Sequence, residues 1–207
     1  MNIMKIYLTR HGETDWNRQK KVQGHVDIPL NSFGREMAQK TAMGLLEVSF
    51  DVAYTSPLIR ARETAEIILK DHNVPLLEEE AIKEISFGLY EGVNYEEIGQ
   101  DVKYGEFIHF FQNPDKYVPA EGGESIEHLK HRVGEFLERL YIDESLQDKN
   151  ILISSHGAAV TAMKNVIKGW TDTADFWKVG RPKNCSVTIV EVVGGKAKIL
   201  EEDKVYH

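Results

Sequence analysis

Apolar positions recur along the chain in two alternating patterns, one typical of buried strands and one typical of amphipathic helices. Short apolar runs that predict strands lie at residues 3–9, 51–55, 150–154, 185–192 and 196–201, with a weaker run at 81–85. Between these runs, apolar residues recur at helical spacing in four segments, 37–46, 58–69, 125–143 and 157–169. This alternation predicts an α/β layer architecture, and the chain length is that of a single domain spanning residues 1–207.

Two parts of the chain depart from the alternation. Gly194 and Gly195 join the last two predicted strands, so these strands should form a hairpin and give an otherwise parallel sheet one antiparallel edge. Residues 87–123 contain half of the chain's phenylalanines and tyrosines together with many acids. We expect this segment to be an insertion that folds over the end of the sheet as a lid.

The composition is that of an ordinary globular protein with an acidic surface. A formal charge of −8 argues against binding to nucleic acid or to an anionic membrane surface, although a local cationic pocket could still hold a small anion. No apolar run approaches the roughly 18 residues that a membrane helix needs. The single cysteine, Cys185, cannot form an internal disulfide and is expected to be a small buried hydrophobe. These features favour a cytoplasmic protein and leave the oligomeric state open, a homodimer included.

The strongest chemical signal is the segment Arg10-His11-Gly12, which follows the first predicted strand. A turn at that point exposes His11 at the carboxyl end of a strand, where open α/β sheets bind ligands. The neighbouring Arg10 lowers the pKa of the imidazole, which keeps it neutral and nucleophilic, and its guanidinium group can clamp a phosphate. The segment therefore predicts a histidine nucleophile, although three residues alone are a weak signal.

Three further segments place a group suited to phosphate chemistry after a predicted strand. Ser56 and Pro57 suit the N-cap and first position of a helix, so Arg60 would lie in its first turn among free backbone N–H groups. His156 precedes another helix, where it can donate to an oxyanion or simply cap the helix. Glu84 can supply a general acid. Read singly, Arg60 and Glu84 are better explained as surface charges.

Taken together, the four segments resemble the histidine phosphatase superfamily, the phosphoglycerate-mutase-like group, and most of all its broad-specificity phosphatases. The matching residues are Arg10-His11-Gly12-Glu13-Thr14, then Asn17 and Gln23-Gly24, then Ser56-Pro57-Leu58 with Arg60-Ala61 and Thr64-Ala65, then the segment from Glu84 to Gly88, and finally Ser155-His156-Gly157. They stand in the family order and cover essentially the whole chain.

The resemblance implies a three-layer α/β sandwich with a mainly parallel six-stranded sheet and helices on both faces. It also implies a two-step transfer through a phosphohistidine. The implied catalytic residues are His11 as nucleophile, Glu84 as general acid and then base, and Arg10, Arg60 and His156 around the phosphate; Asn17, Gln23, Gly24 and Gly157 complete the implied phosphate site. No metal ion or other cofactor is expected, because fixed cations take that role.

The expected activity is hydrolysis of a small phosphorylated metabolite, with a cofactor-dependent phosphoglycerate mutase as the alternative. A mutase must also hold a second anionic group, and the resembling mutases use basic lid residues for it. Residues 85–125 contain only Lys103 and Lys116 as firm cations, unless His109 joins them, against eight acids and eight aromatic residues. The lid therefore favours an uncharged or partly apolar leaving group. A non-catalytic phosphate-binding protein is the weakest alternative.

The remaining candidates have simpler explanations. His128 and His131, with Glu124 and Glu127, have a spacing that could bind metal but is more typical of the solvated face of a helix. Should Glu84 not be the general acid, Glu91 and Glu124 are the next candidates.

Overall fold

The structure is a computed structural model, and it describes residues 2–98 and 102–207. The helices and strands within these residues are β1 (Ile3–Arg10), α1 (Asp15–Arg18), α2 (Ser32–Gly44), β2 (Val52–Thr55), α3 (Ile59–Ile68), β3 (Leu76–Glu78), α4 (Tyr95–Ile98), α5 (His109–Gln112), α6 (Ile126–Ile142), β4 (Asn150–Ser155), α7 (Gly157–Ile167), β5 (Val187–Val193) and β6 (Lys196–Lys204). Short 3₁₀ helices lie in several of the connections.

The strands of the described residues form one six-stranded sheet in the order β3-β2-β4-β1-β5-β6. Strands β3, β2, β4 and β1 pair in parallel, whereas β5 runs antiparallel to both β1 and β6. The predicted hairpin is therefore confirmed, and it forms the antiparallel edge of the sheet. Because β1 and β4 are parallel neighbours with Arg10 opposite Ser155, the residues that follow both strands meet at the same end of the sheet.

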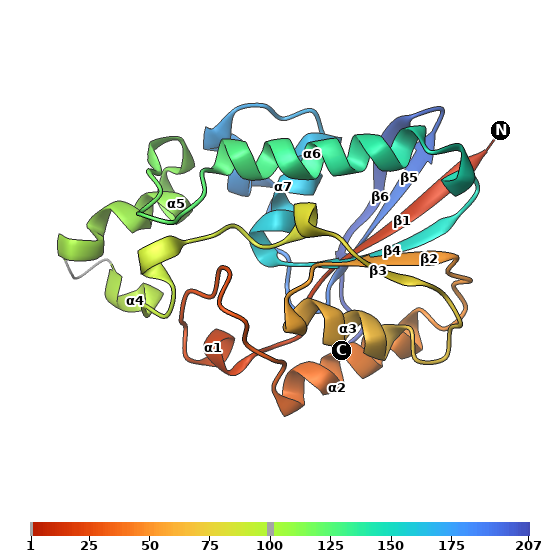
Figure 1. Cartoon of the computed structure of the whole chain (residues 1–207), viewed down its shortest axis with the longest axis horizontal. Coiled ribbons are helices and arrows are strands. Elements are labelled where there is room, and N and C mark those ends of the chain that lie inside the picture. Colours follow the sequence, from red (N-terminus) through yellow and green to blue (C-terminus); the bar gives the residue numbers. More distant parts are fainter. Residues whose placement is uncertain (1, 99–101) are drawn as a thin grey trace.

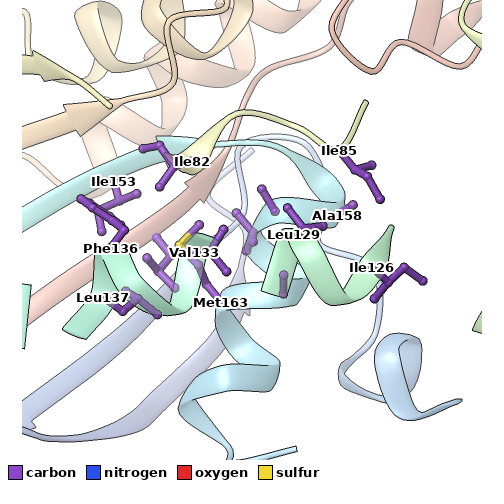
Figure 2. Close-up of a cluster of buried hydrophobic side chains, with 14 of the residues drawn as sticks. Ile82, Ile85, Ile126, Leu129, Val133, Phe136, Leu137, Ile153, Ala158 and Met163 are labelled. Atoms are coloured by element: carbon purple, nitrogen blue, oxygen red, sulfur yellow. The ribbon is translucent and has the colours of Figure 1, made fainter. Parts of the chain in front are cut away.

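Helices cover both faces of this sheet, with α6 and α7 on one face and α2 and α3 on the other (Figure 1). Alternate residues of β1 serve the two layers: Ile6 and Leu8 pack with the α6 and α7 side, and Tyr7 packs with the α2 and α3 side. The apolar stripe of α6, which includes Val133 and Phe136, points into the first of these clusters (Figure 2). The predicted three-layer architecture is confirmed.

One predicted strand is wrong. Residues 81–85 form no strand; instead β3 (Leu76–Glu78) pairs with β2, and the chain then enters a 3₁₀ turn at Glu80–Ile82. The carbonyl oxygens of Ala81, Lys83 and Glu84 accept hydrogen bonds from the guanidinium group of Arg132, at 2.7, 2.8 and 3.0 Å. Arg132 of α6 thus binds the carbonyl oxygens that a neighbouring strand would otherwise bind.

The described parts of the aromatic segment, residues 87–98 and 102–123, contain short helices, with α4 and α5 beyond the carboxyl ends of the parallel strands (Figure 1). Phe87, Phe107 and Phe110 are buried among one another, and the indole Nε1 of Trp177 donates to the carbonyl oxygen of Phe110 at 2.6 Å. This hydrogen bond connects the lid to the segment that precedes β5. No helix within the described residues is long and apolar enough to cross a membrane.

Candidate active site

A cavity of about 450 Å³ opens between the carboxyl end of β1 and the lid. Its walls include eight of the nine predicted site residues, namely Arg10, His11, Asn17, Gln23, Gly24, Arg60, Glu84 and Gly157. The ninth, His156, lies beside them, with its ring centroid 5.3 Å from that of His11. The structure therefore brings together every residue that the sequence predicts for the site.

The buried imidazole of His11 is held in one tautomer. Its Nδ1 lies 2.7 Å from the carbonyl oxygen of Gly12, which can only accept, so the proton sits on Nδ1 and the lone pair on Nε2 is left for attack. Burial, followed by the charges of Arg60 and Arg10, lowers the pKa of His11 well below its usual range. The ring is therefore neutral at pH 7, as a nucleophile requires.

The two arginines are fixed by backbone carbonyls. Arg60 is buried and donates from Nη1 to Val26 at 2.9 Å and from Nη2 to Gly24 at 2.7 Å, while Arg10 donates from Nη1 to Pro182 at 2.8 Å. Burial lowers the pKa of Arg60 to about 10, which still leaves it charged at pH 7. The buried Nε of each arginine has no hydrogen-bond partner among the described residues. The Nε–H group of each arginine is therefore a donor of fixed position that a ligand can use.

Ser56 contacts His156 rather than capping the next helix, so the predicted N-cap is wrong. Helix α3 begins at Ile59, and the Ser56 hydroxyl accepts from the N–H of Leu58 at 3.3 Å and lies 2.7 Å from Nε2 of His156. When the hydroxyl proton donates to Nε2, the imidazole proton lies on Nδ1, and this is the tautomer that we propose. That buried Nδ1 has no partner within the described chain.

The same imidazole occupies the N-cap position of α7 without a side-chain capping bond, so capping does not explain His156. Burial and the charge of Arg60 are the main causes that lower the pKa of His156 well below its usual range. A neutral ring with its proton on Nδ1 is a hydrogen-bond donor of fixed orientation.

Glu84 is buried at the amino terminus of α7 rather than exposed on the surface. Its Oε2 accepts from the N–H of Ala158 at 3.1 Å, and its Oε1 accepts from Ala159 at 3.1 Å and from Ile85 at 3.0 Å. These amides are free because the first turn of a helix lacks acceptors for its N–H groups. The carboxyl group is thereby held in a fixed position on the wall of the cavity that also contains His11.

The buried Thr14 hydroxyl orients both amide side chains of the predicted phosphate site. It lies 3.2 Å from Oδ1 of Asn17 and 2.9 Å from Oε1 of Gln23, and Oδ1 of Asn17 also accepts from the Thr14 N–H at 3.0 Å. Since the Thr14 N–H already holds Oδ1 of Asn17, the single hydroxyl proton can serve Oε1 of Gln23, and the NH₂ group of each amide is left to donate. Thr14 belongs to the recognised motif, but the sequence assigns it no role.

Glu91 clamps the loop that carries the Arg60 acceptors. Its carboxylate accepts from the N–H groups of His25, Val26 and Phe87, at 2.8, 2.9 and 3.1 Å. Gly24 has φ of +52°, and a Cβ built there would lie 2.1 Å from Oε1 of Glu91, so only glycine fits. Glu91 does not line the cavity, so it is a positioning residue rather than an alternative general acid.

Glu124 differs from its prediction as well, because it is part of a partly buried ion pair instead of a solvated helix face. Arg132 donates to it from Nε at 2.6 Å and from Nη2 at 2.8 Å. Burial alone would raise the pKa of Glu124, but the hydrogen bonds from Arg132 and His128 lower it, which unsuits it for acid catalysis. His128, His131 and Glu127 are exposed, as expected.

The cations near the leaving-group side of the cavity come from outside the lid. Neither Lys116 nor His109 lines the cavity, and the side chain of Lys103 lies outside the described part of the chain. Lys21 and Arg181 line it instead. They follow α1 and precede β5, and no motif in the sequence marks either of them.

Comparison with known proteins agrees with this geometry. The family model for the histidine phosphatase superfamily (branch 1) matches residues 6–203. A Bacillus subtilis (strain 168) protein named uncharacterized phosphatase PhoE is 38% identical over 164 residues, which are 79% of this chain and 77% of that protein. Phosphoserine phosphatase 1 of Hydrogenobacter thermophilus is 32% identical over 96% of this chain and 92% of its own length. Proteins named as phosphoglycerate mutases are among the relatives too.

Among solved structures, Bacillus stearothermophilus YhfR superposes with a TM-score of 0.89 at 34% sequence identity, over 97% of each chain. The order of the strands, the helices on both faces and the grouping of the four sequence motifs at one end of the sheet all agree with that relationship. This chain belongs to the histidine phosphatase superfamily, branch 1.

Proposed function

We propose that this protein hydrolyses monoesters of phosphate by passing the phosphoryl group first to His11 and then to water. In the first step, Nε2 of His11 bonds to phosphorus, the ester P–O bond breaks, and Glu84 gives its proton to the departing oxygen. In the second step, the Glu84 carboxylate takes a proton from water, the water oxygen bonds to phosphorus, and the P–N bond breaks. Inorganic phosphate and an alcohol are the products, and Glu84 ends protonated as it began.

The observation that carries this proposal is a set of three buried donors without acceptors. Nε of Arg10, Nε of Arg60 and Nδ1 of His156 have no partner among the described residues, although buried polar groups are nearly always hydrogen-bonded. All three side chains surround His11, which presents a lone pair rather than a proton. Several fixed donors around a nucleophile suit the equatorial oxygens of a transferring phosphoryl group.

The remaining site residues complete the proposed phosphate grip. The NH₂ group of Asn17 would bind a third oxygen, with Gln23 and the backbone amides of Gly24 and Gly157 beside it. Fixed charges of this kind stabilise the transition state without reorganisation, which removes the need for a metal ion. We also propose a cytoplasmic location, because the single cysteine, Cys185, is buried and leaves the chain without an internal disulfide.

Hydrolysis is favoured over mutase activity by the walls of the cavity. The lid contributes Phe87, Tyr95, Phe110 and Phe111 to it, and no cation from the described lid side chains. A mutase must retain and turn a doubly charged intermediate, and the described lid side chains offer no cation that could follow it; Lys21 and Arg181 lie on segments outside the lid. Phosphatases also stand among the nearest relatives by name.

The test is a steady-state assay with p-nitrophenyl phosphate and phenyl phosphate in buffer treated with a chelator. We expect turnover that is unchanged by EDTA and inhibited by vanadate, which adopts the geometry of the transferring group. His11→Asn should reduce it to background, while His131→Asn, on the exposed face of α6, serves as the matched control. Activity that is lost on chelation and restored by Mg²⁺ or Zn²⁺, or that survives in His11→Asn, would refute the proposal.

A further inference from the structure

The cavity is larger than a phosphate group requires. Its volume of about 450 Å³ falls within the range of roughly 300–1,000 Å³ that sites for whole small ligands occupy. Beyond the phosphate residues it is walled by lid aromatics and by Trp177, Lys21 and Arg181. This second part of the cavity must face the leaving group, because the phosphate end is already defined by His11.

The charges on the walls are unbalanced. Among the described residues that line the cavity, Arg10, Arg60, Lys21 and Arg181 are cationic, and Glu84 is the one carboxylate. These four positive charges exceed the three negative charges of a phosphate dianion and an ionised Glu84 by one. When Glu84 is protonated, the excess is two. In a chain of net charge −8, cations without partners at the mouth of a cavity point to an anionic ligand.

Arg181 is the cation whose geometry best fits that ligand. Its guanidinium carbon lies 4.5 Å from the ring centroid of Phe111 and 5.0 Å from that of Trp177, so aromatic faces support it. It makes no hydrogen bond or ion pair with any described residue, unlike Arg60, whose two Nη atoms both bind carbonyl groups. Arg181 is exposed, so its N–H groups are open to a ligand from solvent, and the two rings lie beside its guanidinium group.

Arg181 also lies within electrostatic reach of the phosphate end. Burial is the main reason that the pKa of Arg10 is lowered, and the charge of Arg181 lowers it further. Both arginines also line the same cavity, so one ligand that fills it can meet both guanidinium groups.

We propose that Arg181 binds a carboxylate on the leaving group, so that the preferred substrates are phosphate monoesters with an apolar or aromatic body and a carboxylate at the far end. This inference rests on the proposed phosphatase function. The planar fork of a guanidinium group matches a carboxylate in bidentate fashion. A second phosphate dianion is the rival ligand, but it is more strongly hydrated, so its burial against the aromatic rings costs more than burial of a carboxylate.

The test compares two aryl phosphates that differ in charge but hardly in shape, 4-carboxyphenyl phosphate and 4-carbamoylphenyl phosphate. At pH 7 and fixed ionic strength, we expect kcat/KM for the carboxylate substrate to exceed that for the amide substrate by about tenfold or more. The difference should lie mainly in KM, because a charge-assisted hydrogen bond strengthens binding of the carboxylate by about this factor. Arg181→Met keeps a long side chain over the rings and should bring the ratio close to one. Its kcat/KM for the amide should change by less than about threefold, since that substrate gains little from the charge.

Lys183→Met is the matched control, because Lys183 is exposed, lies two residues away, carries the same charge and does not line the cavity. It should keep the wild-type ratio, and Arg181→Lys should retain part of it. A wild-type ratio near one, or a ratio that persists in Arg181→Met, overturns the proposal. Equal losses on both substrates in Arg181→Met would likewise overturn it, since they would show that Arg181 only supports the lid.

Two further substrates separate the remaining outcomes. If 4-phosphonophenyl phosphate is preferred over the carboxylate by tenfold, the subsite binds a dianion and the assignment to a carboxylate is wrong. Phenyl phosphate, which has no second anion, tests the proposed function alone. Its hydrolysis without any carboxylate preference rejects the role of Arg181 but keeps the phosphatase, whereas failure to hydrolyse any of the esters rejects the phosphatase itself.

Discussion

The two ends of the cavity are built by different means. At the phosphate end, Arg10 ends a strand, Arg60 lies in the first turn of a helix and Glu84 lies in a connection that packs against the start of α7; each is fixed by hydrogen bonds to the backbone. At the leaving-group end, the lid aromatics and Arg181 are held by ring packing and stacking. Hydrogen bonds to a rigid sheet fix atoms closely, whereas packed rings from short helices define mainly a shape.

This difference matches two separate demands on a phosphatase. Stabilising a transition state requires hydrogen-bond donors that are already in place. If the donors had to reorient during the reaction, the free energy of reorientation would cancel the stabilisation that they provide. Choosing a leaving group requires only that one ligand fits better than another. We therefore expect substitutions at the phosphate end to reduce turnover of every ester, and substitutions at the lid to change the ranking among esters.

Arg60→Met should give the largest effect. The substitution removes a buried charge from the transferring group, so kcat/KM should fall by a factor of several hundred or more, corresponding to about 3–4 kcal/mol, for p-nitrophenyl and alkyl phosphates alike. Most of the loss should be in kcat. Because the Arg60 charge helps burial to lower the pKa of His11, its removal raises that pKa, and the acid limb of kcat/KM should move to higher pH.

A thermal melt of Arg60→Met serves as the control, since Gly24 and Val26 lose their donors. If the folded variant loses binding but keeps kcat, or if its acid limb does not move, the phosphate end is not organised as we describe.

Glu84→Gln should come next, with an effect that depends on the leaving group. An alkyl alcohol leaves poorly without a proton, so kcat for an alkyl phosphate should fall by about 10²–10⁴-fold, as is typical on removal of a general acid. A p-nitrophenolate needs little protonation, and its phosphorylation step, measured as a pre-steady-state burst, should be nearly unchanged. Equal losses for both esters in that step would assign the proton transfer to another group.

Ser56→Ala should have a smaller effect, limited to the orientation of His156. Without the hydroxyl, Nε2 of His156 loses its donor, and the ring can place its proton on either nitrogen. We expect kcat to fall by about five- to tenfold, in line with one hydrogen bond of roughly 1 kcal/mol. The ¹⁵N shifts of His156 should show an unprotonated Nε2 in the wild type and a mixture in the variant. Identical spectra would show that Ser56 does not set the tautomer.

Trp177→Phe should give the smallest effect, and only at the lid. It removes the hydrogen bond from Nε1 to the carbonyl of Phe110 but keeps an aromatic ring. KM for aryl phosphates should rise by about two- to fivefold, in keeping with one neutral hydrogen bond. The inhibition constant of inorganic phosphate should stay constant. A parallel change in both constants would mean that the two ends of the cavity are not independent.

The contrast between the two ends also explains what the sequence could predict. His11, Arg60 and His156 lie in short motifs that follow correctly predicted strands, whereas the strand predicted before Glu84 is wrong, and Glu84 joins the group through the resemblance of its motif to a known family. The parallel pairing of β1 with β4 then brings the first and last motifs together. Such local signals are strong because each residue's role depends on its neighbours in the chain.

Other contacts depend on tertiary packing that leaves no local pattern. Arg132 takes the carbonyls of the predicted strand at 81–85 from 48 or more residues away, and that strand is consequently absent from the described sheet. Ser56 has every local mark of an N-cap, yet a histidine 100 residues away engages it. Arg181 reaches the cavity from a loop outside the lid, so a count of lid cations alone could not reveal it.

The central claim, that phosphate is transferred through His11, is tested most directly by trapping the intermediate. The enzyme is mixed briefly with ³²P-labelled phenyl phosphate, quenched in base, digested and mapped by mass spectrometry. The account predicts a label on the peptide that contains His11, stable in base and lost in acid, and absent from His11→Asn. Label on another residue, or rapid hydrolysis with no trapped label in a burst experiment under the same conditions, would contradict it.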